Sequence, residues 1–301
     1  MSIQVLVLGG TGLLGEPVAR KLQADGFTVR ILVRETARAH ERFPIGFEIV
    51  EGDVANPDNL RSALQGCDGV HISVGGQVDQ LSAENVVSLS PGLGISRICY
   101  ISGATVREEN RWFPMVAQKL EAEKAIRECG IPYSIFCPTW PMEMVARFAR
   151  DGKPFMMGKQ PLPVHLFAAA DLARMVSNAF QKQEAANKRF TIFGPEAITL
   201  KNALLQYCSV FHPEVEKVSS IPVWLAKLMG TLMRNPAMKF GVELMGHFEK
   251  TAERGDPAEA NALLGAPQIT LTTWMENRKG KGERLRYSQE RFLAGFSVCF
   301  W

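Results

Sequence analysis

The chain has 301 residues, of which 46% are apolar and 22% charged, a composition typical of a globular protein with a sizeable core. Its 34 basic and 31 acidic side chains leave a net charge of +3, too small a surplus to favour a nucleic-acid partner. No apolar run reaches the length of about 18 residues that a membrane span needs. Segment 3–8 lacks the features of a signal peptide, so we expect a cytoplasmic protein.

The first half of the chain alternates short β-branched segments with helical patterns, as βαβ units do. Strands are expected over 4–8, 28–33, 47–51, 69–74, 97–102 and 133–137. Helices are expected over 13–24, 58–64 and 114–129. This order predicts an α/β fold, a Rossmann-type doubly wound parallel sheet within residues 1–138.

After residue 138 the alternation loosens and prolines divide the chain into short pieces. A helix over 169–180 and a strand over 189–192 are expected to return to the sheet. Segment 221–249 is rich in Trp, Met, Leu and Phe and is interrupted at Pro236, which predicts two helices covering a cleft. Residues 139–279 therefore form a mixed segment that includes a small, mainly helical substrate subdomain, and the tail 280–301 is assigned no function.

A glycine-rich loop directly follows the first expected strand and opens the first helix. It comprises Gly9, Gly10, Thr11, Gly12, Leu13, Leu14 and Gly15. The spacing satisfies both GxGxxG and GxxGxxG, and missing side chains let a pyrophosphate approach the N–H groups of a helix N-terminus. The loop therefore predicts a nicotinamide dinucleotide site, against the plainer alternative of a tight turn without a ligand.

The end of the second strand distinguishes the two nicotinamide cofactors. Arg34 stands there, with Arg38 one helical turn further on, and a basic residue in this place accepts a 2′-phosphate. Glu35 is the competing carboxylate, which would favour the ribose hydroxyls of NAD. We expect NADP in preference to NAD. A solvated strand-end charge is the structural alternative for Arg34.

Two further segments follow strands at the edge of the sheet where the cofactor would lie. Asp53 and Val54 come after the third strand, where Asp53 could accept a hydrogen bond from the adenine amine or could cap the next turn. Ser73, Val74 and Gly75 come after the fourth strand. They are expected to line the path toward the nicotinamide ribose.

Neither the six cysteines nor the five histidines form a metal-binding pattern, because the sequence holds no CxxC, HxxH or HxH. We therefore expect no metal and no disulfide framework. His165 is a candidate acid if the substrate reaches it, and a structural histidine otherwise. The Met-rich series from Trp224 to Met245 is either an adaptable apolar lid or plain core.

These features together resemble the atypical short-chain dehydrogenase/reductases, particularly the NmrA-like branch of the NAD(P)H-binding proteins. The resemblance rests on the glycine loop, Arg34, the Gly52–Asp53 pair and segments 100–103 and 131–139, and it spans about residues 1–200. It implies an NAD(P)-binding domain with a small carboxyl-terminal substrate part. The group includes reductases and catalytically silent redox sensors.

The resemblance also implies catalytic roles. Short-chain reductases use a Ser that polarises the carbonyl and a YxxxK motif that supplies the proton and binds ribose, and Ser102 and Lys119 fit the Ser and the Lys. Met115 stands at the tyrosine position and has no proton to give. Pro138 belongs to the expected cofactor site. A strand-end cap and a solvated helix residue are the plainer roles for Ser102 and Lys119.

The sequence therefore leaves two possible functions. The first is an NADP-dependent reductase acting on a small apolar carbonyl or activated double bond, with Lys119 and Ser102 in the reaction centre. The second is an NADP(H)-binding sensor or scaffold without turnover, which Met115 favours. The expected partners are the dinucleotide and a small apolar substrate, and the sequence predicts no oligomeric state.

Overall fold

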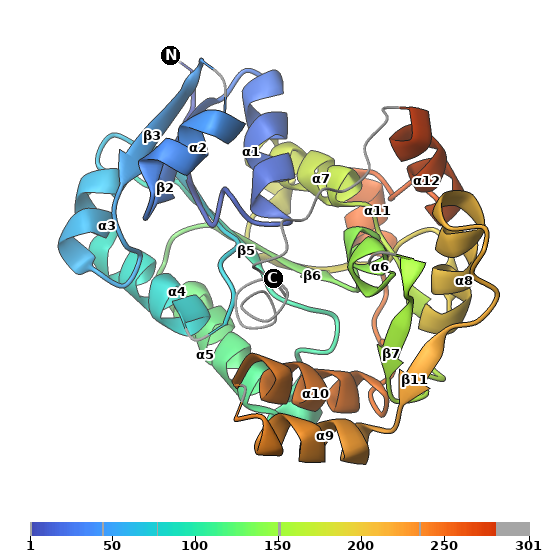
Figure 1. Ribbon diagram of the computed structural model, residues 1–301. Helices are drawn as coiled ribbons and strands as arrows, with labels where there is room; N and C mark the ends of the chain where they lie inside the picture. The colour runs from blue at the N-terminus through green and yellow to red at the C-terminus, as the bar shows by residue number, and fades with distance from the viewer. Residues whose placement is uncertain (1, 44, 77, 150–151, 235, 281–301) are drawn as a thin grey trace.

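The computed structural model describes residues 2–43, 45–76, 78–149, 152–234 and 236–280. Within these ranges a seven-stranded sheet has the order β3-β2-β1-β4-β5-β6-β9, and all its neighbouring strands pair in parallel (Figure 1). The strands are β1 (Gln4–Leu8), β2 (Thr28–Val33), β3 (Phe47–Glu51), β4 (Gly69–Ile72), β5 (Arg97–Ile101), β6 (Tyr133–Pro138) and β9 (Lys188–Ile192). The strand order confirms the Rossmann-type fold.

Helices cover both faces of this sheet. One face carries α1 (Gly15–Ala24), α2 (Thr36–Arg42), α7 (Ala169–Gln181) and α11 (Ala258–Leu264). The other carries α3 (Pro57–Leu64), α4 (Val78–Leu89) and α5 (Pro114–Glu128). Because side chains alternate along a strand, Val5 and Val7 of β1 join one core cluster, and Leu6 and Leu8 join the other.

A third apolar cluster joins α5 to the carboxyl-terminal segments. The helices beyond the sheet are α6 (Glu143–Phe148), α8 (Leu200–Phe211), α9 (Val223–Leu232), α10 (Pro236–Phe248) and α12 (Leu271–Gly280). Two small sheets pair β7 (Phe155–Met157) with β11 (Ser219–Ile221) and β8 (Val164–His165) with β10 (Ala197–Ile198). Single 3-10 turns lie at Glu108–Asn110 and Gln183–Ala185.

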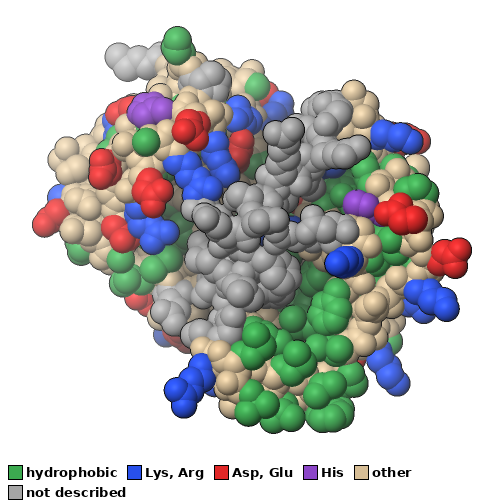
Figure 2. Space-filling view, viewed as in Figure 1, with side chains coloured by type: hydrophobic (Ala, Val, Ile, Leu, Met, Phe, Trp, Pro, Cys, Tyr) green, Lys and Arg blue, Asp and Glu red, His purple; other side chains and the backbone are tan. Residues whose placement is uncertain are grey.

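The two helices expected within 221–249 are present, with Pro236 as the first residue of α10. Proline is well tolerated there because the first N–H of a helix has no intrahelical acceptor. Apolar side chains gather over α9, at the lower edge of the face in Figure 2. Among the described helices, none is long and apolar enough to cross a membrane. Residues 281–301 of the tail lie outside the described ranges.

Two elements differ from their expected bounds beside the glycine loop. Strand β4 ends at Ile72 rather than at residue 74, and Ser73 then lies against the loop while its N–H donates to Leu8 O (3.0 Å). Helix α1 begins at Gly15 rather than at residue 13. The reason is a tight turn in which Gly12 N–H donates to Gly9 O (2.8 Å) before the helix starts.

Candidate functional site

The glycine loop connects β1 to α1 and packs closely against the segment after β4. Gly9 has a φ of +79°, and a Cβ there would lie 2.4 Å from Ser73 O. A Cβ on Gly15 would lie 2.1 Å from Gly9 O, and one on Gly10 would lie 2.6 Å from Ile31 Cγ2. These three glycines are therefore required by the packing of the protein itself.

Gly12 differs from the other glycines of the loop. A Cβ on Gly12 would meet Gly9 O at 3.0 Å and no other described atom within 4 Å. One side of Gly12 is therefore open, and a ligand can approach the backbone there. This arrangement fits a pyrophosphate better than a turn without a ligand.

The start of α1 offers hydrogen-bond donors to such a ligand. Leu14 is the N-cap and its side chain makes no capping bond. In the described ranges, the N–H groups of Leu13 and Leu14 have no protein acceptor. They lie at the positive end of the helix, where an anion is stabilised. Thr11 is held differently, because its carbonyl accepts from Arg42 Nη1 (2.8 Å).

Arg34 and Arg38 lie near the carboxyl end of β2. Arg34 is exposed directly after the strand, Arg38 is half-buried on α2, and Glu35 is the exposed N-cap of that helix. Neither guanidinium forms an ion pair with a carboxylate in the part of the chain that the structure describes. Arg42, which the sequence reading missed, ends α2 and bonds the glycine loop. In the sequence, Arg42 could have been found from its position one helical turn after Arg38.

The segments after β3 and β4 lie at the same edge as the glycine loop, because β1 to β4 are parallel. Asp53 Oδ1 accepts from Ala55 N–H (2.9 Å), so one of its oxygens stabilises the local turn. Val54 is half-buried and its carbonyl accepts from Asn85 Nδ2 (3.0 Å). Ser73 is buried, while Val74 and Gly75 are half-buried. The structure brings these residues together with the loop.

Lys119 lies on α5 and is buried, with 1% of its side chain exposed. Its Nζ is 2.6 Å from Asp79 Oδ2 and donates to Ile101 O (2.9 Å). Tyr100 OH donates to the other oxygen of Asp79 (3.1 Å). Burial raises the pKa of the Asp79 carboxyl despite the ammonium group beside it. The ammonium group of Lys119 is therefore held inside the protein by Asp79 and by the carbonyl of Ile101.

Ser102, directly after β5, is fully buried and its hydroxyl hydrogen-bonds Glu123. Glu123 Oε2 also accepts from Arg127 Nη1 and Arg189 Nε, both at 2.9 Å. Ser102 thus belongs to a buried polar group centred on Glu123, and it directly follows Ile101, whose carbonyl binds Lys119. Met115 is buried one helical turn before Lys119, in the third apolar cluster.

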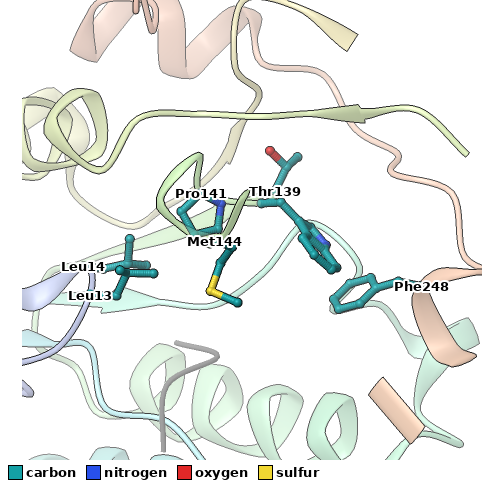
Figure 3. Close-up of a pocket in the computed structure, with 7 residues that line it drawn as sticks. Leu13, Leu14, Thr139, Pro141, Met144 and Phe248 are labelled. Atoms are coloured by element: carbon teal, nitrogen blue, oxygen red, sulfur yellow. The ribbon is translucent and has the colours of Figure 1, made fainter. Parts of the chain in front are cut away.

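An apolar pocket adjoins the glycine loop. It is lined by Leu13, Leu14, Thr139, Trp140, Pro141, Met144 and Phe248. In Figure 3, Leu13 and Leu14 form one side, Phe248 stands on the other, and Met144 extends between them. Pro138, which ends β6, directly precedes this lining. The pocket combines cofactor-loop residues with Phe248 of α10, which lies in the segment 221–249 expected to cover a cleft, and with Met144 of α6, which no sequence pattern had indicated.

The pocket offers little acid–base chemistry of its own. Thr139 and Trp140 bring the polar groups of its lining, a hydroxyl and an indole N–H, and the Thr139 hydroxyl donates to the carbonyl of His165. His165 Nδ1 lies 3.1 Å from Glu253 Oε2, and its ring stacks on Phe193 with 4.6 Å between centroids. Burial raises the pKa of Glu253. Trp224, Met229 and Met233 are exposed on α9 and just after it, whereas Met245 is core.

A family model described as NAD(P)H-binding matches residues 9–183, which is more than half of the chain. The protein belongs to the NAD(P)H-binding family. The match begins at Gly9 and includes Arg34, Ser102 and Lys119. The expected family resemblance is therefore confirmed, and binding of a nicotinamide dinucleotide is supported by both the family and the loop geometry.

Curated relatives include enzymes and assembly factors. The chain is 26% identical over 204 residues to an NAD(P)H azoreductase from Xenophilus azovorans, with 65% of this chain and 69% of the relative covered. It is 23% identical over 243 residues to a photosystem II assembly factor from Trieres chinensis, with 76% of each chain covered.

Solved structures agree on the fold. An NADPH-dependent quinone oxidoreductase from Escherichia coli superposes with a TM-score of 0.72 at 20% identity, covering 91% of this chain and 98% of that one. A triphenylmethane reductase from Citrobacter, solved with NADP(H), also gives 0.72 at 20% identity, covering 91% and 99%. At this identity the likeness shows the fold alone.

Proposed function

We propose that the protein is an NADP(H)-dependent reductase that passes a hydride to a small apolar acceptor, a carbonyl or an activated double bond, which binds against the small apolar pocket (about 10 Å³) beside the glycine loop. The observation that carries the proposal is that Leu13 and Leu14 belong both to that loop and to the pocket wall. The pocket extends from there to residues that follow β6. In this fold the nicotinamide half of a dinucleotide lies on the β4–β6 side of the β1/β4 switch point.

Each part of the cofactor has a candidate binding group. The N–H groups at the start of α1 and the open side of Gly12 would hold the pyrophosphate. Arg34 and Arg38 would bind the 2′-phosphate, which supports NADP over NAD. Asp53 and Val54 would meet the adenine. Ser73, Val74, Gly75 and Pro138 would line the nicotinamide half, and the bound dinucleotide supplies the hydride.

The chemistry of the pocket limits the kinds of molecule that can accept the hydride. Its lining is apolar except for the Thr139 hydroxyl, which is already used as a donor, and the indole N–H of Trp140, which is not an acid. Hydride addition to an isolated ketone develops an alkoxide that needs a proton donor in the site. A conjugated double bond or a quinone instead spreads the new charge, and water can supply the proton afterwards. The pocket therefore favours conjugated acceptors over simple ketones.

Lys119 and Ser102 would act in this proposal as positioning residues. Lys119 Nζ donates to Ile101 O at the end of β5, and Ser102 is the next residue along the chain. Their buried partners Asp79 and Glu123 would hold this strand end in one conformation. A fixed strand end keeps the floor of the cofactor site in place for hydride transfer.

The test is oxidation of NADPH, followed by absorbance, with a quinone, an enone and a simple ketone offered at equal concentration. Turnover is expected with the first two and to be slower with the ketone. Met144→Phe should fill the pocket and raise the KM for the acceptor while leaving the Kd of NADPH unchanged. Met157→Phe, at a buried methionine of β7 outside the pocket, is the matched control. Faster ketone reduction, or equal effects of the two variants, would contradict the proposal.

A second candidate is an NADP(H)-binding sensor or scaffold of the NmrA-like type that turns nothing over. The observation favouring it is that Lys119 and Ser102 are both engaged by buried carboxylates while Met115 replaces the tyrosine. Calorimetry of NADPH binding alongside the turnover assay separates the candidates. Tight binding without oxidation by any acceptor supports the sensor, and turnover with a quinone excludes it.

A further inference from the structure

Helix α9 presents a continuous apolar surface to solvent. We define the α9 surface as Trp224, Leu228, Met229, Leu232 and Met233. Their exposed fractions lie between 40% and 74%. The spacing 224, 228, 232 and 229, 233 places them along one side of the helix. Figure 2 shows this patch of apolar side chains at the lower edge of the molecule, with basic side chains at its margin.

Helix α9 exposes its large apolar side chains and buries small ones, which is the reverse of an ordinary surface helix. Its buried positions are the small residues Ala226 and Gly230, and Gly230 packs on α10, where a Cβ would lie 3.5 Å from Lys239 N. A surface helix normally buries its large apolar side chains and exposes small or polar ones. A contiguous exposed patch of this kind marks an interaction site.

Basic residues predominate in the segment that carries the α9 surface, and the nearest acidic residue after it in the chain is the exposed Glu243 of α10. Between Val218 and Val242 the sequence contains Lys227, Arg234 and Lys239 and no Asp or Glu. All three basic side chains are exposed. Two copies of the chain meeting through this surface would bring their basic residues together, whereas an anionic surface would attract them.

We propose that the α9 surface docks on an anionic lipid bilayer, with α9 lying in the plane of the interface. Large apolar side chains with basic residues beside them are the signature of an interfacial helix. Trp224 suits the headgroup level because its ring is both apolar and polar. Lys227, Arg234 and Lys239 pair with lipid phosphates. The inference is independent of the proposed function.

The experiment is co-sedimentation of the full-length protein with vesicles of phosphatidylcholine alone or mixed with phosphatidylglycerol. Binding is expected to the mixed vesicles and to weaken by about tenfold or more on pure phosphatidylcholine or at high salt. Leu228→Ser/Leu232→Ser should lower the affinity by about tenfold or more. Leu81→Ser is the control, because Leu81 is 40% exposed on α4, away from α9. Binding should also shift the Trp fluorescence to the blue, and Trp224→Phe should remove that shift.

Several results would overturn the proposal. These are an absence of sedimentation with the mixed vesicles, equal effects of the α9 variant and Leu81→Ser, or binding lost in a full-length Phe292→Ser/Phe300→Ser variant but kept in the α9 variant. A dimer in solution that the α9 variant dissociates, without vesicle binding, would assign the surface to a second copy. Vesicle binding equal on both lipid compositions would remove the anionic requirement.

Discussion

Lys119 Nζ and Asp79 Oδ2 lie 2.6 Å apart between α5 and α4, and neither side chain reaches solvent. An ion pair in the interior is expensive to form, because both charges leave water. Once it is formed, removing either partner leaves the other charge buried without compensation. Lys119 was expected to be catalytic. Its pairing with Asp79 raises the question of whether it positions the cofactor site or donates a proton, and the two roles predict different results.

Lys119→Ala should lower the free energy of unfolding by about 3–5 kcal/mol, because the buried Asp79 carboxylate loses its partner. Lys119→Met/Asp79→Asn removes both charges and should cost much less. Urea unfolding of the two variants measures the difference. A Lys119→Ala protein as stable as the double variant would contradict the pairing.

The same double variant tests the role of Lys119 in turnover. If Lys119 only positions the end of β5, the double variant loses the bond from Nζ to Ile101 O, and kcat should fall modestly while its pH profile keeps its shape. If Lys119 donates a proton, kcat should fall by a factor of roughly a hundred to ten thousand. The pH profile of kcat decides between them, since loss of a proton donor also removes one limb of that profile.

Gly12→Val should abolish NADP(H) binding in a folded protein. The open side of Gly12 faces no described atom other than Gly9 O, so the fold tolerates a side chain better here than at Gly15. The valine instead occupies the space through which the pyrophosphate approaches. Calorimetry measures the loss, with Gly280→Ala as the control at a position where a Cβ meets no atom of the described residues within 4 Å. Retained affinity would remove the pyrophosphate from this loop.

Arg34→Ala should weaken NADPH by about tenfold or more and leave NADH nearly unchanged, because a charge-assisted bond to the 2′-phosphate is lost. Arg61→Ala, at an exposed arginine of α3, provides the comparison for a general change in charge. Titrations with NADPH and with NADH give the ratio of the two Kd values for each variant. Equal losses for NADPH and NADH would assign Arg34 a structural part instead.

We expect the free energy of unfolding to depend on pH through His71. It is fully buried in β4, neither ring nitrogen has a described hydrogen-bond partner, and burial lowers its pKa to about 3. As the pH falls, the unfolded chain, with a histidine pKa of about 6.5, takes up a proton at a higher pH than the folded protein does. The free energy of unfolding therefore decreases as the pH falls from about 6.5 toward 3. From pH 7 to pH 5 this amounts to about 2 kcal/mol.

His71→Leu should flatten that decline and raise stability at pH 5. His40→Leu, at an exposed histidine of α2, should leave the decline unchanged. Urea unfolding at pH 7, 6 and 5 measures all three proteins. Parallel pH profiles for the parent and His71→Leu would show that His71 titrates normally.

The sequence by itself determined the sheet, the glycine loop and the family. Strands such as β1 and β2 are short β-branched runs, and the glycines stand at fixed offsets between a strand and a helix. Signals of this kind are local, because backbone geometry ties neighbouring residues to one element. Arg34 and Ser73 could be placed at the sheet edge for the same reason, since the carboxyl ends of parallel strands meet there.

Only the tertiary structure decided which partners these residues have. Asp79 stands forty positions before Lys119, and Glu123 meets Ser102 across the turn between β5 and α5. The pocket joins the loop after β1 to α6 and to Phe248 at the end of α10. No spacing in the sequence encodes these contacts. They arise because packing helices against the sheet brings distant segments within hydrogen-bonding and van der Waals distance, where buried charges must find partners.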